Sequence, residues 1–511
     1  MKKLAITIIL STLLTACMTS SVRMVYESKP ESVTILHTND IHSAFLPTTI
    51  KAKEPQGQNR ELGGILALNY HVKKIHQEKE NVLLLNAGDF MTGSPICDIE
   101  ADGAMGGAMV KFFNYIGFEG LAPGNHEFDI SVSNAQKLFE LCEFPVFSAN
   151  LFTADGKLFT REPYQIYRKG DLVVGVIGTI VDDLPDYLNK PQRDQVVAKP
   201  SAPIVDSLAK ILDPLTDLIV VLSHNGLEAD SLLAEKVSSQ IDVIIGGHSH
   251  HRLENAIKVN RKLIIQAGSR LRDLGRLDLT VVADTVQSFT YQLIPLWTEG
   301  IEPDSVLNNE IKKYEQLIDQ EFGRVIGELK TPWQRSGNSE SNLGNFVADC
   351  MRQFSQADLA VINSGGIRQD LPAGPIKKLD IKNILPFNNS IIKFRATGKQ
   401  VLDLIRVNAE AAATNSSGIL QVSGLICEWK VENDGSISII KATVGGEKID
   451  PVRIYSGATV DFVLSNAEKY LGFMPTEATN LMIPLTDVVM KIIEEQKVIN
   501  SIVEGRMVGK K

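Results

Sequence analysis

The feature that most constrains the fold is a repeated pattern in which a short apolar run is followed at once by polar and glycine-rich residues. Such runs occupy residues 33–36, 82–85, 218–222 and 243–245, with helix-like stretches such as 66–79, 131–141 and 231–239 between them. Continuous apolar strands that alternate with helices are typical of an α/β fold with buried sheets. Ligands in such folds gather beyond the carboxyl ends of the strands. The residues that directly follow the runs are therefore the first candidates for a functional site.

These residues share one chemistry, because they offer oxygen and nitrogen ligands and no thiolate. They are Asp40, His42, Asp89, Asn125, His224, His248 and His250. Seven such donors are too many for one tetrahedral zinc with an open position. They suit two divalent ions about 3.5–4 Å apart that share a carboxylate and together activate water and clamp a phosphoester.

Each of these residues also has a structural interpretation, as a cap, a turn former or a core histidine. Coincidence is a poor explanation for all of them, because five of the nine histidines stand at strand ends beside Gly or Asn. We expect the other four (His37, His71, His76 and His251) to serve structure or to face solvent.

The segment 124–129, Gly-Asn-His-Glu-Phe-Asp, adds candidate catalytic groups. If it is extended, neighbouring side chains point to opposite sides, so Asn125 would face a metal and His126 a substrate. Asp129 could hold the far nitrogen of His126 and fix its tautomer. By the same alternation, residues 40 and 42, and residues 248 and 250, would each project from one side of an extended segment.

Segments 37–42, 86–89, 124–127, 223–224 and 246–250 together resemble the 5′-nucleotidase branch of the calcineurin-like metallophosphoesterases. The resemblance implies a four-layer α/β/β/α domain. It also implies one metal at Asp40, His42 and His250, a second metal at Asn125, His224 and His248, and Asp89 as the bridging ligand. His126, paired with Asp129, would stabilise charge on the phosphoryl group or protonate the leaving oxygen. The ligand types suit Zn²⁺, Mn²⁺, Fe or Mg²⁺.

Segments 341–345, 363–368 and 385–389 resemble the smaller α/β substrate-binding domain of the same family. In relatives this domain supplies arginines for phosphates and two aromatic side chains that sandwich the base. We therefore expect Asn363, Arg368 and Asn389 to contact substrate, with Arg395 as a second arginine or simply a surface residue.

The aromatic clamp is where the chain departs from the family. The position of the first stacking ring falls at Ile419, and Phe473 is the candidate for the second, with a core role as its alternative. Losing one aromatic face would cost roughly 1–3 kcal/mol of stacking per base. Base recognition is therefore expected to be weaker than in relatives.

The domain organisation follows from these matches. Residues 1–17 have a basic start, an apolar stretch and Leu-Thr-Ala-Cys, which resembles a lipoprotein signal with Cys17 as the lipidated residue. A cleaved secretory peptide with a chance cysteine is the alternative. We expect a tether at 18–30, a two-metal domain at 31–297, a connecting helix at 305–322 within the linker 298–327 and a substrate-binding domain at 328–511. The lipid would be the only membrane attachment, at the outer membrane facing the periplasm or at the cell surface.

Composition and cysteine usage narrow the remaining choices. A formal net charge of −9 argues against non-specific binding to a nucleic acid duplex. The four later cysteines allow three full disulfide pairings, or they are isolated buried thiols. Oligomeric state is left open.

The function that we predict is a lipid-anchored, two-metal phosphohydrolase that most readily fits nucleotides, cleaved to nucleoside and phosphate. Alternatives are a cyclic-nucleotide or nucleotide-sugar phosphodiesterase, an enzyme that hydrolyses a sulfur analogue such as thiosulfate on a carrier, and a surface metal-binding protein without activity. His126 and Asp129 favour an enzyme, because a metal binder does not need them.

Overall fold

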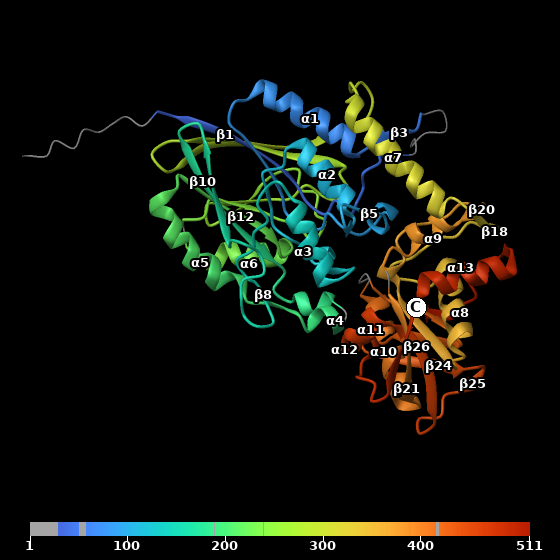
Figure 1. Cartoon of the computed structure of the whole chain (residues 1–511). Helices are drawn as coiled ribbons and strands as arrows, with labels where there is room; N and C mark the ends of the chain where they lie inside the picture. Colours follow the sequence, from blue (N-terminus) through green and yellow to red (C-terminus); the bar gives the residue numbers. More distant parts are fainter. Residues whose placement is uncertain are drawn as a thin grey trace, which may run out of the picture.

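The computed structural model describes residues 29–50, 58–188, 190–238, 240–387, 389–414 and 418–510. The predicted signal segment 1–17, its Cys17 and nearly all of the tether 18–30 lie outside these residues. Within the described part, each helix is too short or too polar to cross a lipid bilayer. Two domains follow one another along the chain, the first drawn in blue to yellow and the second in orange to red (Figure 1).

Two sheets form the centre of the first domain. The first sheet has the order β17 (Val286–Pro295), β16 (Asp273–Val281), β1 (Glu31–Thr38), β4 (Val82–Asn86) and β7 (Gly120–Leu121). The second has the order β14 (Ile257–Val259), β15 (Lys262–Ile265), β13 (Val243–Ile245), β12 (Leu218–His224), β10 (Leu172–Ile180) and β9 (Tyr164–Lys169). The apolar runs of the sequence are the buried strands β1, β4, β12 and β13, as the pattern predicts.

Helices cover the outer face of each sheet, so the domain has four layers. Apolar residues of α1 (Ile65–Glu78), α2 (Gly107–Ile116) and α7 (Ser305–Phe322) pack with those of the first sheet. Residues of α5 (Ser201–Leu212) and α6 (Leu227–Lys236) pack on the second sheet. A further core, which includes Ile35, Leu85 and Val220, lies between the sheets. Figure 1 shows the two helical layers on opposite sides, and the predicted α/β/β/α architecture is confirmed.

Parallel pairing places the candidate ligands at one end of this sandwich. Strands β1, β4 and β7 pair in parallel in the first sheet, and β10, β12, β13 and β15 do so in the second. The carboxyl ends of parallel strands meet at one edge of each sheet. The loops that follow β1, β4, β7, β12 and β13 therefore converge, which is where binding sites of α/β folds form.

The second domain is built on a five-stranded sheet in the order β22 (Leu420–Ser423), β19 (Leu359–Asn363), β26 (Ile454–Val460), β21 (Ser390–Thr397) and β27 (Ala478–Pro484). Its core takes residues from α8 (Asn342–Ser355), α9 (Lys378–Ile384), α10 (Gly398–Ala413) and α13 (Leu485–Gln496). Two short helices, α11 (Asp461–Ser465) and α12 (Ala467–Leu471), follow β26. A three-stranded sheet contains β20 (Gly374–Lys377), β18 (Val325–Leu329) and β28 (Val498–Ile499). A four-stranded sheet contains β25 (Glu447–Lys448), β24 (Ile437–Val444), β23 (Leu425–Val431) and β29 (Met507–Lys510).

The helix that we predicted as a connector has the expected extent, but it packs on the first domain. Leu307, Ile311 and Tyr314 of α7 are buried with residues of α1 and α2. Asp304 caps its first turn by accepting hydrogen bonds from the Val306 and Leu307 amides. The chain therefore enters the second domain directly from the end of a docked helix.

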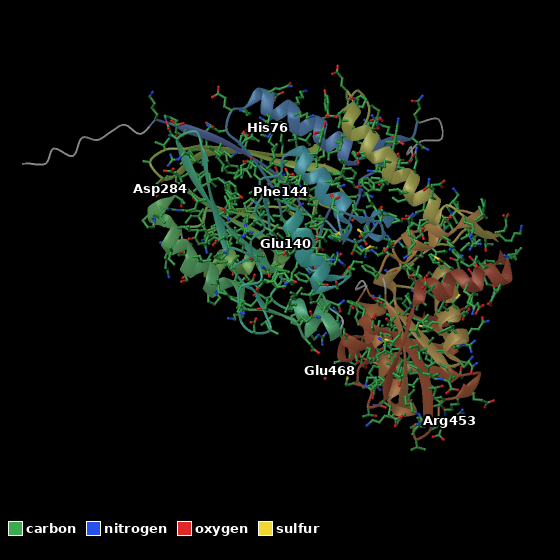
Figure 2. The ribbon with its side chains drawn as sticks, viewed as in Figure 1. His76, Glu140, Phe144, Asp284, Arg453 and Glu468 are labelled. Atoms are coloured by element: carbon green, nitrogen blue, oxygen red, sulfur yellow. The ribbon has the colours of Figure 1, made fainter. Side chains whose placement is uncertain are left out.

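The four later cysteines and two of the histidines outside the candidate site have structural or surface positions. Cys97, Cys142, Cys350 and Cys427 are free thiols, so the pairing alternative is wrong for these four. Figure 2 shows His76 at the surface on α1, as expected. His37 is fully buried in β1, where burial lowers its pKa to about 3.

Candidate metal centre and substrate cavity

Tight turns, and not extended segments, present most of the candidate ligands. Asp40, His42, Asp89, His248 and His250 all have a positive φ, between 48° and 70°. This left-handed region is uncommon for residues other than glycine, and Asp and His are among those that tolerate it best. Our prediction of extended backbone at residues 40–42 and 248–250 is therefore wrong. The chain must turn sharply at each strand end to aim side chains back across the edge of the sheets.

The Asn125 segment is also not extended. Asn125 has φ −73° and ψ −30° and begins the 3₁₀ turn η2 (His126–Phe128). One such turn brings residues three apart together. His126 Nδ1 consequently lies 2.7 Å from Asp129 Oδ2, the contact that the spacing predicts, although the backbone reason differs.

The ligand atoms form two adjoining groups. Asp40, His42 and His250 have donor atoms within 4.8 Å of one another, and Asp89, His224 and His248 do likewise. His42 Nε2 and His250 Nε2 are 2.9 Å apart, and His224 Nε2 is 3.1 Å from Asp89 Oδ2. Asn125 Oδ1 joins the second group, 3.0 Å from His248 Nδ1. The structure thus brings all seven predicted ligands together.

The tautomers of two rings show that this donor set fits cations. His42 Nδ1 lies 3.0 Å from the Thr92 carbonyl oxygen, and His224 Nδ1 lies 2.6 Å from that of Ala87. A carbonyl only accepts, so each Nδ1 carries a proton and each Nε2 is the nitrogen left to bind a metal. His224 Nε2 is buried and has no hydrogen-bond partner among the described residues. Nε2 atoms that lie close to carboxylates match the ligands of two divalent cations.

The charges of the cluster follow the same logic. Burial lowers the pKa of His42 to about 3 and that of His248 to about 4, so both rings are neutral near pH 7, as metal ligands must be. Burial opposes ionisation of Asp89, yet the rings of His224 and His126 hold the pKa of this carboxyl well below its usual range. Burial lowers the pKa of His224, but the Asp89 carboxylate outweighs burial and raises it to about 10, so a cation that binds at His224 must displace the Nε2 proton.

Glu127 is a site residue that the sequence argument missed. Its carboxylate is fully buried and accepts hydrogen bonds from the backbone amides of Gly124, Asp89, Phe90 and Met91, at 2.6, 3.0, 2.8 and 3.1 Å. Burial and the nearby Asp89 raise its pKa to about 7. Glu127 fixes the loop that carries Asp89 to the loop that carries Asn125. Because its partners are main-chain groups, sequence spacing gives no sign of this role.

His126 stands between the metal groups and the second domain. Burial lowers its pKa, but the Asp129 and Asp89 carboxylates outweigh burial and raise it to about 9. Thr92 Oγ1 donates to Asp129 at 2.7 Å and so holds the orienting carboxylate. The Phe387 ring stacks on His126 with a centroid separation of 5.6 Å, and Arg368 Cζ lies 5.8 Å from the centre of the same Phe387 ring.

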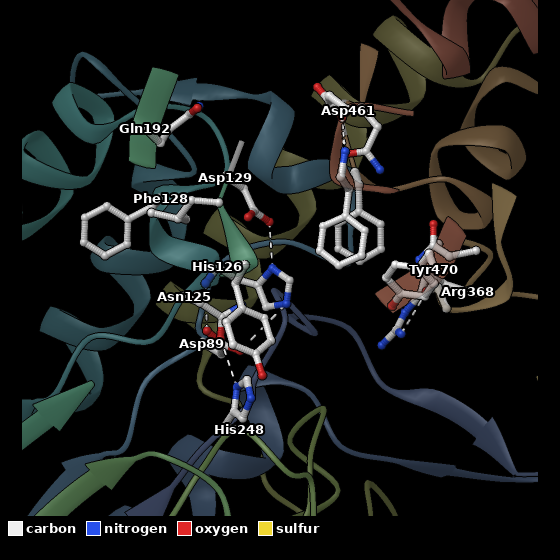
Figure 3. A pocket seen from close by; sticks show the side chains of 18 of the residues that line it. Asp89, Asn125, His126, Phe128, Asp129, Gln192, His248, Arg368, Asp461 and Tyr470 are labelled. Atoms are coloured by element: carbon white, nitrogen blue, oxygen red, sulfur yellow. Dashed lines mark hydrogen bonds and ion pairs between the residues drawn. The ribbon is translucent and has the colours of Figure 1, made fainter. Parts of the chain in front are cut away.

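A cavity of about 280 Å³ opens beside these groups, between the two domains (Figure 3). One side carries Asp89, Asn125, His126, Asp129, His248 and His250. The predicted substrate residues Asn363, Arg368 and Asn389 line the other side. Asn363 Oδ1 is buried without a hydrogen-bond partner in the described part of the chain. Figure 3 shows Arg368 and Tyr470 facing the metal side.

Three predicted substrate residues lie elsewhere, which corrects the prediction. Ile419 is fully buried in the core of the second domain, and Phe473 packs against Phe394 of that core. Arg395 points outward from β21, where its exposed side chain pairs with Glu477. Core packing accounts for Ile419 and Phe473, and an ion pair accounts for Arg395. None of the three side chains therefore needs a ligand.

Other aromatic residues line the cavity in their place. Phe462 and Tyr470 come from α11 and α12, with ring centroids 6.0 Å apart and planes inclined by 55°. Tyr187 comes from the first domain and meets His248 edge-on at 4.8 Å. Phe462 and Tyr470 stand eleven and three residues before Phe473, so a search for further aromatic residues near that position would find them. No comparable signal marks Tyr187.

Comparisons with known proteins agree with this geometry. Residues 33–252 match the calcineurin-like phosphoesterase family, and residues 325–474 match the 5′-nucleotidase C-terminal domain. The 5′-nucleotidase of Bos taurus is 25% identical over 94% of this chain and 91% of its own length. Protein UshA of Escherichia coli is 26% identical over 92% of each chain.

Solved structures share the complete two-domain fold. The 5′-nucleotidase precursor of Thermus thermophilus has a TM-score of 0.79 at 24% identity and covers 94% of this chain and 99% of its own. The Thermus thermophilus sulfate thiohydrolase SoxB has a TM-score of 0.74 at 16% identity and covers 93% and 96%. With the ligand cluster, the two family matches establish that the chain is a metal-dependent phosphoester hydrolase of the 5′-nucleotidase family, a calcineurin-like phosphoesterase that uses two divalent metal ions and carries a 5′-nucleotidase C-terminal domain.

Proposed function

We propose that this enzyme hydrolyses nucleotides to nucleosides and inorganic phosphate. The observation that carries the proposal is the two-sided cavity, with metal ligands and His126 on one side and Phe462 and Tyr470 on the other. A phosphate ester at the first side leaves a flat base to rest against the aromatic rings. Relatives named 5′-nucleotidase support the same substrate class.

The chain's own residues account for the remaining chemistry. When bound, the two divalent ions would activate the attacking water and neutralise phosphoryl charge. Asp129 fixes the His126 ring so that Nε2–H faces the cavity, where it can donate to a phosphoryl oxygen or protonate the leaving oxygen. The bond from water oxygen to phosphorus forms, the ester P–O bond breaks, and the leaving oxygen takes a proton. Arg368 adds positive charge on the substrate side.

Turnover of a substrate panel tests the proposal. Purified enzyme with Mn²⁺ or Zn²⁺ would be assayed on AMP, UDP-glucose, a cyclic nucleotide and an aryl phosphate. Release of phosphate from AMP with a higher kcat/KM than from the aryl phosphate is expected, because the nucleotide carries its base beyond the ribose, toward the aromatic side, while its phosphate occupies the metal side. Faster cleavage of the cyclic nucleotide or of UDP-glucose would indicate a phosphodiesterase instead, and cleavage of none would favour a metal-binding protein.

We further propose that the enzyme is a lipoprotein held outside the cytoplasmic membrane through Cys17. The support is the Leu-Thr-Ala-Cys signal after an apolar stretch. Mass spectrometry of the mature N-terminus should find a lipidated Cys17, and Cys17→Ser should release the protein into the soluble fraction. An unmodified N-terminus at another residue would contradict the proposal.

A further inference from the structure

One segment of the first domain reaches across to the second. It runs from η3 (Leu184–Tyr187) through α4 (Lys190–Arg193) to β11 (Val196–Ala198). Pairing of β11 with β8 (Leu151–Thr153) fixes one end, and an apolar cluster that includes Leu184 and Leu188 fixes the other. Figure 1 shows α4 beside α11 and α12.

Arg193 holds this segment in place at the domain boundary. Its Nε donates to the Pro185 carbonyl at 2.8 Å, within the segment itself. Its Nη2 lies 3.5 Å from the Ser465 carbonyl at the end of α11, in the second domain. The residue that precedes Arg193 on α4 is therefore presented to the cavity by a segment that is anchored on both domains.

That residue, Gln192, has an unsatisfied side chain. It is 8% exposed and lines the cavity together with Tyr187 and Leu188. Its Oε1 is buried and has no hydrogen-bond partner among the residues that the structure describes. A buried amide oxygen without a donor costs free energy, so such groups are nearly always paired.

The residues around Gln192 indicate which donor would give a hydrogen bond to its Oε1. Tyr187, Phe462 and Tyr470 line the same cavity and offer flat, largely apolar surfaces. A base that packs against them keeps its polar edge free to meet an amide. A glutamine amide matches an exocyclic amino group and the ring nitrogen beside it, with Oε1 accepting from the amino group and Nε2 donating to the ring nitrogen.

We propose that Gln192 determines base specificity and selects nucleotides whose base carries an exocyclic amino group, such as those of adenine or cytosine. The proposal rests on nucleotide hydrolysis as proposed above and deepens it by naming the substrate class. Gln192 acts on binding of the base and not on the reacting phosphorus. Its effect should therefore appear in comparisons between bases and vanish for substrates that have none.

The test compares AMP with purine riboside 5′-monophosphate, which lacks only the amino group. The parent enzyme should prefer AMP about tenfold or more in kcat/KM, because the analogue leaves Oε1 unpaired. Gln192→Met should bring this ratio to about 1 by lowering kcat/KM for AMP, and should leave cleavage of p-nitrophenyl phosphate unchanged. Gln192→Glu keeps an acceptor oxygen and should keep the preference.

Gln195→Met is the matched control, because Gln195 stands in the same segment with an exposed side chain outside the cavity. It should leave the ratio as it is in the parent. A ratio near 1 in the parent, or an unchanged ratio in Gln192→Met, overturns the role of Gln192 while nucleotide hydrolysis stands. Cleavage of p-nitrophenyl phosphate without cleavage of any nucleotide overturns both proposals together.

Discussion

Glu127→Gln perturbs the link between the two metal-bearing loops without changing side-chain size. Both carboxylate oxygens of Glu127 accept backbone amides, Oε1 from Phe90 and Met91 and Oε2 from Gly124 and Asp89. A glutamine can satisfy one of these pairs. Its NH₂ group must face the other pair, where it meets two N–H donors and accepts nothing.

The cost follows from those two lost pairs. At pH 8, above its pKa of about 7, Glu127 is mainly a charged acceptor; hydrogen bonds to such a group contribute about 1.5–3 kcal/mol each, so two of them amount to about 3–6 kcal/mol. A folded domain has about 5–15 kcal/mol in total, so the variant should fold but unfold at a clearly lower temperature. Divalent-metal affinity and kcat/KM should fall as well, because Asp89 and Asn125 lose their common support.

Scanning calorimetry of the metal-free and metal-loaded protein, with isothermal titration of Mn²⁺, measures these effects. The matched control is Glu140→Gln, because Glu140 is exposed on α3 (Val132–Leu141), as Figure 2 shows, and should change stability by no more than about 0.5 kcal/mol. If Glu127→Gln matches this control in unfolding temperature and metal affinity, the proposed role of the carboxylate is refuted.

Three further results are expected. Burial raises the pKa of Asp230 to about 7, so its ionised form destabilises the fold, and this penalty grows as pH rises from about 4 to 7. The free energy of unfolding of Asp230→Asn at pH 8 should therefore exceed that of the parent by up to about 4 kcal/mol. Denaturant titrations should show this difference disappear near pH 4. Tyr470→Ala should lower kcat/KM for AMP about 5- to 150-fold, whereas Phe473→Ala should reduce stability and leave kinetics unchanged; equal kinetic effects would contradict the cavity assignment. Chelation should abolish turnover and lower the melting temperature, and Mn²⁺ should restore both in the parent but only the melting temperature in His126→Ala.

Much of the fold could be predicted because burial on both faces leaves an unmistakable sequence pattern. Runs such as 33–36 and 218–222 contain only residues that a buried strand accepts, and α7 has the predicted bounds. The ligands could be predicted because they stand directly after those runs. Helix α6 began four residues before the predicted Ser231, because Gly226, with φ +89°, turns the chain at the strand end and the helix follows at once.

Backbone conformation in the loops could not be predicted. From the alternation of side chains we predicted extended backbone at His248 and Asn125. The loops instead use left-handed and helical backbone conformations, which direct the side chains to one point. Such conformations depend on the contacts that over-determine them, including the four amides bound by Glu127. Local sequence does not contain those contacts.

The substrate side was hardest to predict, because it is assembled from two domains. Tyr187 and Tyr470 are almost 300 positions apart in the sequence and meet only through the docking of α4 beside α12. We assigned Ile419 and Phe473 to the family's clamp from the resemblance, but Phe462 of α11 and Tyr470 of α12 line the cavity instead. A resemblance transfers positions well where strands fix them and poorly where loops do.

Locating bound ions in a crystal would test the assignment of two metal sites to the seven ligands. Crystals grown with Mn²⁺ would be measured near the manganese absorption edge, where anomalous scattering identifies the metal. Two manganese peaks per chain are expected, one among Asp40, His42 and His250 and one among Asn125, His224 and His248, with Asp89 in contact with both. A single peak, or peaks away from these side chains, would contradict the assignment.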